Sequence, residues 1–393
     1  MFERTSAVIR DGSKLSFEYV PEKIVHREGQ MKQLEMLFRP MVTEGRACSA
    51  FLSGGVGTGK TVTAKRFCED AIRHCARSGK PIGYLYVNCR IRNTEHSVLL
   101  QMVRYYDPGY SERGFSAEEM LRAFRAHTEN SARPMILILD EVDVLLKGGS
   151  RNLIYQITRM NEELRKASVS PILISQTSVA ELLDEASMST FRRANSVRFD
   201  RYTQEELRTI ITLRSEEALV HGSLGESEIS LLAEIAMQYG DARFAIELIE
   251  RSATVAEAGE AGKITADDIR TANAMIYSDV SENKLKDLDH NRRLALLAIA
   301  RAIKGNAYIT IAAAEKTYAV VCEEYNEVAR KHTQFWTYVQ DMERMGLLST
   351  TVKSEIDRGR TTYISIPNIP PKELAKKLEY ILETPFSTDQ DEF

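Results

Sequence analysis

Long apolar runs are missing from this chain of 393 residues. The longest, such as LALLAIA at 294–300, are far shorter than the roughly 20 residues that a membrane-spanning helix needs. The stretch MFERTSAVIRDGSK carries charges where a secretory signal peptide has an apolar core. We therefore expect a soluble, cytoplasmic protein that has no membrane partner.

Cysteine is scarce and shows no pattern. The chain has neither a C-x-x-C pair nor a spacing of cysteine to histidine typical of zinc sites. The pattern therefore favours buried thiols in a reducing cytosol and no cysteine-held metal. The five cysteines are Cys48, Cys68, Cys75, Cys89 and Cys322.

Charge of one sign is not in excess either, because the formal net charge is only -4. Composition alone therefore gives no argument for a nucleic-acid or membrane partner. Internal repeats and low-complexity tracts are also missing. The length predicts two or three domains, and a hydrophobic content of 43% is enough to build their cores.

What the chain does contain is a glycine-rich stretch, SGGVGTGKT, at 53–61. Gly54 and the run Gly59, Lys60 and Thr61 fit the phosphate-binding pattern G-x-x-x-x-G-K-[ST]. An apolar run of strand length precedes the stretch, and residues with helical periodicity follow it. Backbone N–H groups of such a loop, and the start of the next helix, bind phosphates. A flexible glycine turn is the alternative, and the flanking strand and helix argue against it.

We predict that this loop binds ATP or ADP with Mg²⁺. The Lys60 ammonium would reach the β and γ phosphates, and the Thr61 hydroxyl would complete the coordination of Mg²⁺. The loop residues predicted to hold the nucleotide are Gly55, Gly57, Thr58, Gly59, Lys60, Thr61 and Val62.

A second motif, MILILDEVD at 135–143, ends an apolar run in two acids. A buried strand delivers them to the edge of the sheet beside the phosphate-binding loop. Asp140 would hold Mg²⁺ there, and Glu141 would orient or deprotonate the attacking water. The alternative is a helix cap after a core strand, because Asp is a good N-cap residue.

The order of the elements predicts three domains. Five strand-like runs alternate with helical patterns, which predicts a parallel sheet with helices on both faces. They are SAFLS, GYLYVNC, MILILD, PILISQT and SVRFD. From about Tyr202 the strands stop, and four amphipathic helices follow. We expect an α/β nucleotide-binding core at 1–200, a helical lid at 201–280 and a third domain at 281–393.

Three helices and two strands around a charged turn make the third domain a winged helix. In its third helix, at 332–346, the spacing predicts that Phe335, Val339, Met342 and one side of Trp336 face the core. The outward face is the kind that a recognition helix lays in the major groove. It would carry Gln334, Thr337, Tyr338, Asp341 and Arg344.

The charged turn supplies further DNA contacts, because its cations are placed to meet phosphate or the minor groove. Together the predicted DNA-binding residues are Gln334, Thr337, Tyr338, Lys353, Arg358 and Arg360. A winged helix that contacts protein instead remains open, because residues 286–393 carry 15 basic against 16 acidic residues.

The chain resembles the AAA+ ATPases and, within them, the archaeal origin-recognition initiators related to eukaryotic origin-recognition and Cdc loader proteins. The resemblance covers nearly the whole chain. It rests on YVPEKIVHREGQMKQL, the phosphate-binding loop, YVNCR, ILDEVD, PILISQTS and YGDARFAIELI. It implies an AAA+ αβα core with a five-stranded parallel sheet, a helical lid and a C-terminal winged helix.

The resemblance also implies roles for particular residues. Val25, His26 and Arg27 would wrap the adenine. Arg243 corresponds to the arginine of the second sensor, which reaches from the lid to the γ phosphate. Such an arginine would make the position of the lid depend on the bound nucleotide. Without the resemblance, Arg243 would be interpreted as a cation on a helix surface.

The chain departs from the family at the first sensor, where an asparagine is usual and this sequence has Gln176. The same amide on a longer stem predicts slow or poorly coupled hydrolysis. Glu141, Gln176 and Arg243 form the predicted catalytic set. Arg192 or Arg193 could be an arginine finger for a neighbouring subunit, or both could form a solvated surface pair. The family's helical insertion, a second DNA contact, would lie within 90–114.

The resemblance implies a DNA replication initiator in an archaeal cell, associated with the nucleoid. It would bind double-stranded origin DNA, help to recruit or load the replicative MCM helicase, and work with paralogous initiator subunits. Its ATPase activity would be that of a slow switch. Two other classes remain open. A clamp-loader-like machine is disfavoured by the substituted sensor and the DNA-binding domain, and a signalling or transcription-regulating ATPase could share the same three parts.

Overall fold

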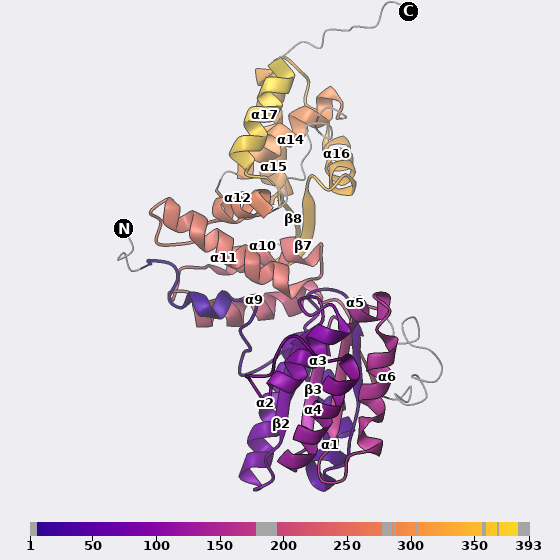
Figure 1. Cartoon of the computed structure of the whole chain (residues 1–393). Coiled ribbons are helices and arrows are strands. Elements are labelled where there is room, and N and C mark those ends of the chain that lie inside the picture. Colours follow the sequence, from indigo (N-terminus) through magenta and orange to yellow (C-terminus); the bar gives the residue numbers. More distant parts are fainter. Residues whose placement is uncertain are drawn as a thin grey trace, which may run out of the picture. The chain divides into compact units, whose positions relative to one another are not determined.

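A computed structural model describes residues 6–177, 195–276, 285, 288–303, 305–355, 359–367 and 369–383. The chain forms two compact units (Figure 1). The core unit comprises residues 20–202 and 240–242, and the lid and winged-helix unit comprises 1–19, 203–239 and 243–393. In the part of the chain that the structure describes, every helix is too short or too polar to cross a membrane.

The core unit is built on a parallel sheet of five strands in the order β2-β3-β4-β1-β5. The five strands confirm the five apolar runs predicted from the sequence, within two residues at each end. They are β1 (Ala50–Gly54), β2 (Gly83–Asn88), β3 (Met135–Asp140), β4 (Val169–Ser175) and β5 (Ser196–Phe199). Both β3 and β4 are buried along their whole length, as expected for inner strands of a parallel sheet.

Helices cover both faces of this sheet, because alternate residues of each strand point to opposite sides. Ile136 and Ile138 pack with α1 (Glu28–Glu44) and α2 (Lys60–Arg77), whereas Leu137 and Leu139 pack on the other face. That second face is covered by α3 (Glu95–Arg104), α4 (Ala117–Ser131), α5 (Val142–Lys147) and α6 (Arg151–Arg159), and η2 (Met160–Glu162) follows. The predicted three-layer core is confirmed.

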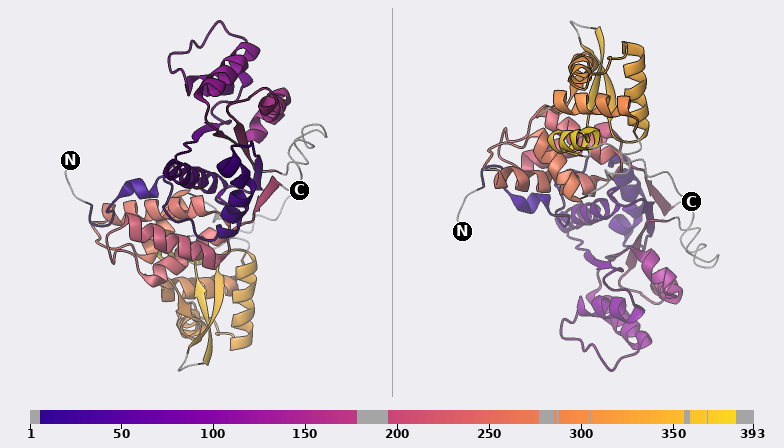
Figure 2. Two further views of the ribbon diagram at one scale, coloured as in Figure 1. Left: turned by 90° about the horizontal axis from the view of Figure 1, so that it is seen from below. Right: turned by 90° about the horizontal axis from the view of Figure 1, so that it is seen from above.

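The helices α3 and α4 form a pair whose connecting loop lies at the outer edge of the core unit (Figure 2). Each begins with a capping box, from Thr94 with Ser97 and from Ser116 with Glu119, which satisfies backbone N–H groups at both helix starts. The predicted insertion at 90–114 covers α3 and most of this loop. Its contact with DNA remains a prediction.

Four helices form the lid, as predicted. They are α9 (Gln204–Ala218), α10 (Glu226–Met237), α11 (Ala242–Ala258) and α12 (Ala266–Ile276). The short helix η1 (Gly12–Leu15) packs on α9, and Ile9 pairs with Leu219 in an antiparallel bridge. The N-terminal segment therefore belongs to the lid rather than to the core, although the sequence analysis placed it in the core at 1–200.

The winged helix consists of α14 (His290–Ile303), α15 (Ile311–Glu324) and α16 (His332–Arg344), with the hairpin of β7 (Ser349–Glu355) and β8 (Gly359–Ser365). These elements confirm the predicted three helices and two strands. The structure adds β6 (Ile309–Thr310), which pairs with β8, and α17 (Pro371–Glu383), which packs on α14. The spacing of Leu374, Leu378 and Ile381 could have predicted α17.

A buried guanidinium joins the lid helix α12 to the winged helix. The side chain of Arg270 is 0% exposed. Its Nε donates to the carbonyl of Ile366 at 2.8 Å, and its Nη2 donates to the carbonyls of Asn306 at 2.9 Å and Ala307 at 3.0 Å. Asp267 lies 3.1 Å from Nη1 and supplies the opposite charge. One lid residue thus satisfies three backbone acceptors of the winged helix.

The cysteines are mostly buried, as the sequence predicted. Cys68, Cys75, Cys89 and Cys322 are buried, whereas Cys48 is half-buried. Burial raises the pKa of the Cys68 and Cys89 thiols well above the ordinary value, so both remain protonated and unreactive.

Candidate functional site

The phosphate-binding loop lies between the end of β1 and the start of α2, as its sequence pattern requires. Gly57 and Gly59 have φ angles of 66° and 89°, which favour glycine. A Cβ at Gly59 would lie 2.5 Å from the Tyr202 hydroxyl, and one at Gly57 would lie 1.4 Å from Oδ1 of Asp241. Both positions therefore exclude a side chain for reasons of conformation and of space.

The Lys60 ammonium lies inside the loop. Its Nζ donates to the carbonyls of Gly54 at 2.7 Å and Gly55 at 2.6 Å, and the residue is only 8% exposed. The Thr58 hydroxyl also donates to the Gly55 carbonyl, at 2.9 Å. Anionic phosphate oxygens are stronger acceptors for an ammonium than neutral carbonyls are. When a phosphate enters the loop, the Lys60 ammonium can therefore replace its hydrogen bonds to the two carbonyls with hydrogen bonds to phosphate oxygens.

Asp140 ends β3 and is 4% exposed. Its Oδ2 accepts hydrogen bonds from the Thr61 hydroxyl at 2.7 Å and from the Tyr86 hydroxyl at 2.9 Å. Its Oδ1 accepts from the backbone N–H of Glu141 at 2.9 Å. The two predicted magnesium ligands, Thr61 and Asp140, therefore lie in contact. Tyr86 is not among the predicted site residues, although the alternation along β2 could have placed it beside α2.

Glu141 follows directly in a left-handed conformation, with a φ of 53°. Such a conformation costs on the order of 1 to 3 kcal/mol for a residue other than glycine and is common at functional sites. Its Oε2 lies 3.0 Å from Nε of Arg90 in an ion pair. That contact lacks hydrogen-bond geometry, so the buried Oε2 has no hydrogen-bond partner among the residues that the structure describes. Sequence reasoning did not find Arg90.

The segment before α1 clamps the loop to the sheet. Arg27 is 5% exposed, and its Nε and Nη2 donate to the carbonyls of Thr58 at 2.9 Å and Asp200 at 2.8 Å. Its guanidinium stacks 3.7 Å from the centre of the Tyr202 ring. Arg27 thus fixes the loop to the end of β5. A contact of Arg27 with adenine remains a prediction, and its guanidinium is already engaged by protein groups.

His26 and half-buried Val25 precede this arginine. Within the described part of the chain, Nε2 of His26 is buried and has no hydrogen-bond partner. A buried polar atom without a partner is costly unless a ligand satisfies it. The side chain is therefore compatible with the predicted adenine contact, which remains a prediction.

These residues fit a magnesium nucleotide. The loop excludes side chains at two glycines, the buried Lys60 supplies a positive charge, and Thr61 and Asp140 supply adjacent oxygen ligands. Mg²⁺ commonly takes one or two protein oxygens together with phosphate oxygens and water. Lys60, Thr61 and Asp140 would therefore hold the metal and the phosphates.

We expect Lys60→Ala to weaken the binding of ATP about 10- to 150-fold, the equivalent of losing one charge-assisted hydrogen bond of roughly 1.5 to 3 kcal/mol. Fluorescence anisotropy with a labelled ATP analogue measures the affinity. Lys80→Ala, at an exposed lysine beyond the end of α2, is the control and should bind like the unmodified chain. Unchanged affinity of Lys60→Ala would rule out the assignment of the loop.

The remaining predicted catalytic residues lie in different places. Gln176 is exposed and follows the end of β4, where Ser175 donates to Oδ1 of Asp143 at 3.2 Å. Arg243 lies in α11 of the other unit, with its guanidinium 5.4 Å from the centre of the Phe17 ring. The sensor roles of both remain predictions. Arg192 and Arg193 lie outside the described residues.

The outer face of α16 carries part of the predicted DNA contacts. Gln334, Thr337 and Arg344 are exposed, and Phe335, Val339 and Met342 are fully buried, as predicted. The prediction that Tyr338 faces outward is wrong, because Tyr338 is only 6% exposed.

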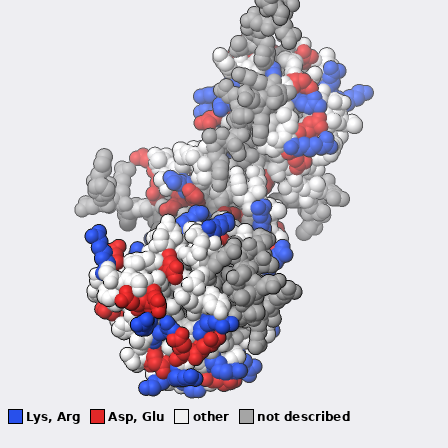
Figure 3. Space-filling view, turned by 45° about the vertical axis from the view of Figure 1, so that its right-hand side comes forward, with Lys and Arg blue, Asp and Glu red and all other residues white. Residues whose placement is uncertain are grey.

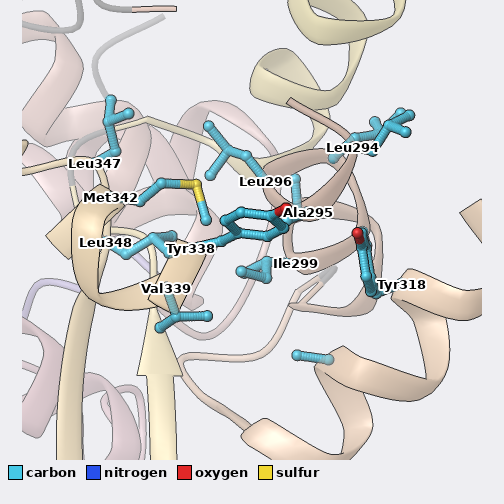
Figure 4. Packing of buried hydrophobic residues seen from close by; sticks show 14 of the residues in the cluster. Leu294, Ala295, Leu296, Ile299, Tyr318, Tyr338, Val339, Met342, Leu347 and Leu348 are labelled. Carbon is cyan, nitrogen blue, oxygen red and sulfur yellow. The ribbon is translucent and has the colours of Figure 1, made fainter. Parts of the chain in front are cut away.

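Figure 4 shows the Tyr338 ring among Leu296, Ile299 and Met342, in the space between α14 and α16. Position 338 follows Phe335 by three residues, so both lie on the same face of the helix. The Arg292 guanidinium lies over the Tyr338 ring, 5.2 Å from its centre. Burial of the large aromatic ring therefore determines the orientation of Tyr338, although its hydroxyl is polar.

The hairpin positions the other predicted contacts. Lys353 lies in β7 opposite Thr361, and Arg360 lies in β8 opposite Ser354. Arg358 lies outside the described residues. Acidic and basic side chains are interspersed on the face of the winged helix seen in Figure 3. Net charge therefore favours neither DNA nor protein as the partner of this domain.

Comparison with known families gives three successive matches. A model of an AAA domain matches residues 44–183. The Cdc6 AAA+ ATPase-type lid domain matches residues 208–274, and the C-terminal winged helix domain of CDC6 matches residues 283–377. These matches follow the same order as the predicted core, lid and winged helix.

Similar proteins cover nearly the whole chain. ORC1-type DNA replication protein 2 of Sulfurisphaera tokodaii is 29% identical over 377 residues, which cover 92% of this chain and 90% of that protein. The ORC1-type DNA replication protein of Pyrococcus furiosus is 29% identical over 384 residues, which cover 96% and 91%.

Two solved structures are also similar. Cdc6p from Pyrobaculum aerophilum has a TM-score of 0.84 at 27% identity and covers 96% of this chain and 99% of its own. The Aeropyrum pernix ORC1 protein in complex with DNA has a TM-score of 0.65 at 25% identity and covers 96% and 98%.

Proposed function

The chain belongs to the archaeal Cdc6/Orc1 family of AAA+ replication initiators, and we propose that it binds origin DNA under the control of ATP and helps to recruit the replicative MCM helicase. The observation that carries this proposal is the presence, in one chain, of a phosphate-binding site with a carboxylate pair and a winged helix with an exposed polar helix face. The similar ORC1 protein of Aeropyrum pernix was solved in complex with DNA, which supports DNA as the partner.

The residues of the site support hydrolysis of ATP, and they support a slow rate. Magnesium, when bound, would neutralise phosphate charge and polarise the γ phosphate. The Glu141 carboxylate accepts a proton from the attacking water, as a general base. The Arg90 guanidinium lies 3.0 Å from Oε2 of this carboxylate, so the ion pair is lost when Glu141 takes up the proton. Gln176 presents its amide on a longer stem than asparagine, which positions the water less firmly.

A slow ATPase suits a switch rather than a motor. The bound nucleotide then persists long enough for the chain to remain in one state on DNA. We propose that the ATP-bound state is the one that holds origin DNA and recruits the helicase. Paralogous initiator subunits of the same family would bind beside it.

The experiment compares the affinity of the full chain for three duplexes, with ATP and with ADP. They are a replication origin of the source genome, a promoter of equal length and a scrambled sequence. We expect the highest affinity for the origin with ATP, and retention of purified MCM helicase only on that complex. A preference for the promoter would favour a transcription regulator, and equal affinity for all three would contradict origin recognition.

For the recognition helix, we expect Gln334→Ala to weaken binding to the preferred origin site by roughly 5- to 150-fold, because one base-edge contact contributes about 1 to 3 kcal/mol. Binding to scrambled DNA should change little, since phosphate contacts are retained. Titrations with both duplexes measure the ratio. Gln33→Ala, at an exposed glutamine of α1, is the control. An equal loss on both duplexes would show that Gln334 does not read bases.

A further inference from the structure

A groove of about 610 Å³ runs between α1 and α2 on the side of the core unit away from the sheet. Its floor is apolar. Phe38 of α1 and Phe67 of α2 meet edge to face there, with ring centres 5.2 Å apart, and Met31, Val42 and Ala71 extend the floor. The size is in the range of pockets that hold a ligand or several side chains of a partner.

The rim of the groove is mainly basic. Arg39 lies on α1, and Arg66, Arg73 and Arg77 lie on α2, whereas the acidic side chains at the rim are Glu35 and Asp70. Four guanidinium groups therefore line the groove beside two carboxylates, and a third carboxylate, that of Glu69, lies 3.7 Å from Nη1 of Arg66. This local excess contrasts with the balanced charge of the whole chain.

The ion pairs divide the four arginines into two sets. Asp70 lies 2.8 Å from Nη2 of Arg66 and 2.8 Å from Nη2 of Arg73, so it neutralises part of their charge. Across the described part of the chain, neither Arg39 nor Arg77 takes part in an ion pair. Both are exposed, one on each helix. Among the residues that the structure describes, these two guanidinium groups beside the apolar lining thus have no carboxylate partner.

We propose that this groove is the docking site for an acidic, amphipathic segment of a partner protein. Carboxylates of the segment would pair with Arg39 and Arg77, because a guanidinium binds a carboxylate through two parallel hydrogen bonds. Bulky apolar side chains of the same segment would contact the half-buried Met31 and Val42 above the buried rings of Phe38 and Phe67, in the manner of an amphipathic helix that lies in a groove.

The apolar lining of the groove favours a protein segment over a nucleic acid as the partner. A phosphate backbone has nothing to bury against the half-buried Met31 and Val42, and the carboxylates of Glu35 and Asp70 would repel it. An acidic peptide with apolar side chains uses both features of the groove. The inference concerns α1 and the outer side of α2, and it does not depend on the proposed function.

The test is fluorescence anisotropy of the full chain with a labelled synthetic peptide, EDLLEDFLDE, at low and at physiological salt. Two further probes are the peptide in which serine replaces the apolar residues and a basic peptide, KRLLKRFLRK. We expect the acidic amphipathic peptide to bind at least tenfold more tightly than either of the others. Failure of the unmodified chain to prefer this peptide would overturn the proposal.

The double variant Arg39→Glu and Arg77→Glu tests whether the acidic peptide binds in this groove. Both side chains are exposed, so the fold should be retained, and circular dichroism checks this. We expect at least a tenfold loss of affinity for the acidic peptide and a gain for the basic one. The control is Arg122→Glu with Arg133→Glu, at exposed positions elsewhere in the core unit, which should bind the acidic peptide as the unmodified chain does. Equal peptide affinity of both double variants would overturn the proposal. Loss of duplex DNA binding with unchanged peptide binding would identify the groove as a DNA surface and would overturn it as well.

Discussion

Glu141→Gln is expected to lower the rate of ATP hydrolysis on the order of 10²- to 10⁴-fold, the usual contribution of a general base. The substitution keeps the shape of the side chain and removes its capacity to take a proton. Glu141 lies directly after Asp140, whose contacts with Thr61 and Tyr86 do not involve the substituted carboxylate. Nucleotide binding should therefore be retained. Release of phosphate under single-turnover conditions measures the rate, and anisotropy of a labelled ATP analogue measures the binding.

Glu118→Gln, at a carboxylate of α4 with 77% of its side chain exposed, is the control for this experiment. It should hydrolyse ATP at the rate of the unmodified chain. If Glu141→Gln also does so, Glu141 is not the catalytic carboxylate. If Glu141→Gln loses nucleotide binding, the residue instead helps to form the loop, and its strained conformation would have a structural cause.

Arg270→Ala is expected to destabilise the lid and winged-helix unit by about 3 to 5 kcal/mol, the usual cost of removing one partner of a buried charged contact. The substitution leaves the carbonyls of Asn306, Ala307 and Ile366 without their donor, and a buried acceptor without a partner costs roughly 1 to 3 kcal/mol. Unfolding by urea, followed by the fluorescence of Trp336, measures the free energy. Trp336 is the only tryptophan in the sequence and lies in α16, so it reports on this unit.

Arg251→Ala, at a guanidinium of α11 with 59% of its side chain exposed, serves as the matched control and should change stability by less than about 0.5 kcal/mol. A similarly small change for Arg270→Ala would mean that water replaces the guanidinium at all three carbonyls. The contact would then contribute to the geometry of the junction and not to its stability.

The parts of the fold that the sequence predicted well depend on local patterns. A few consecutive residues are enough to identify the phosphate-binding loop, the acidic end of β3 and each of the five strands. Strand runs such as MILILD are unambiguous because both faces of the sheet are covered. The family resemblance added the order of core, lid and winged helix, which the matched family models confirm.

The parts that could not be predicted depend on contacts between distant residues. Arg90 lies 51 positions before Glu141, and nothing in its neighbourhood indicates that it pairs with the catalytic carboxylate. Arg270 lies in a polar helix turn and is buried only because the winged helix covers it. Tyr338 was misplaced because a tyrosine has both a polar end and an apolar ring, and the packing between α14 and α16 determines which of them prevails.

The contact between Gly57 and Asp241 has a consequence for how the sequence can change over time. The Asp241 carboxylate occupies the space that any side chain at position 57 would need, and the backbone of Ala242 donates to the Gly57 carbonyl at 3.1 Å. Mutations at the two sites are therefore epistatic, although 184 positions separate them along the chain. A glycine to alanine change at 57 would need Asp241 to become smaller or to move, and the φ of 66° at position 57 would still disfavour alanine. In the evolution of this phosphate-binding loop, the order of substitutions at positions 57 and 241 is therefore constrained.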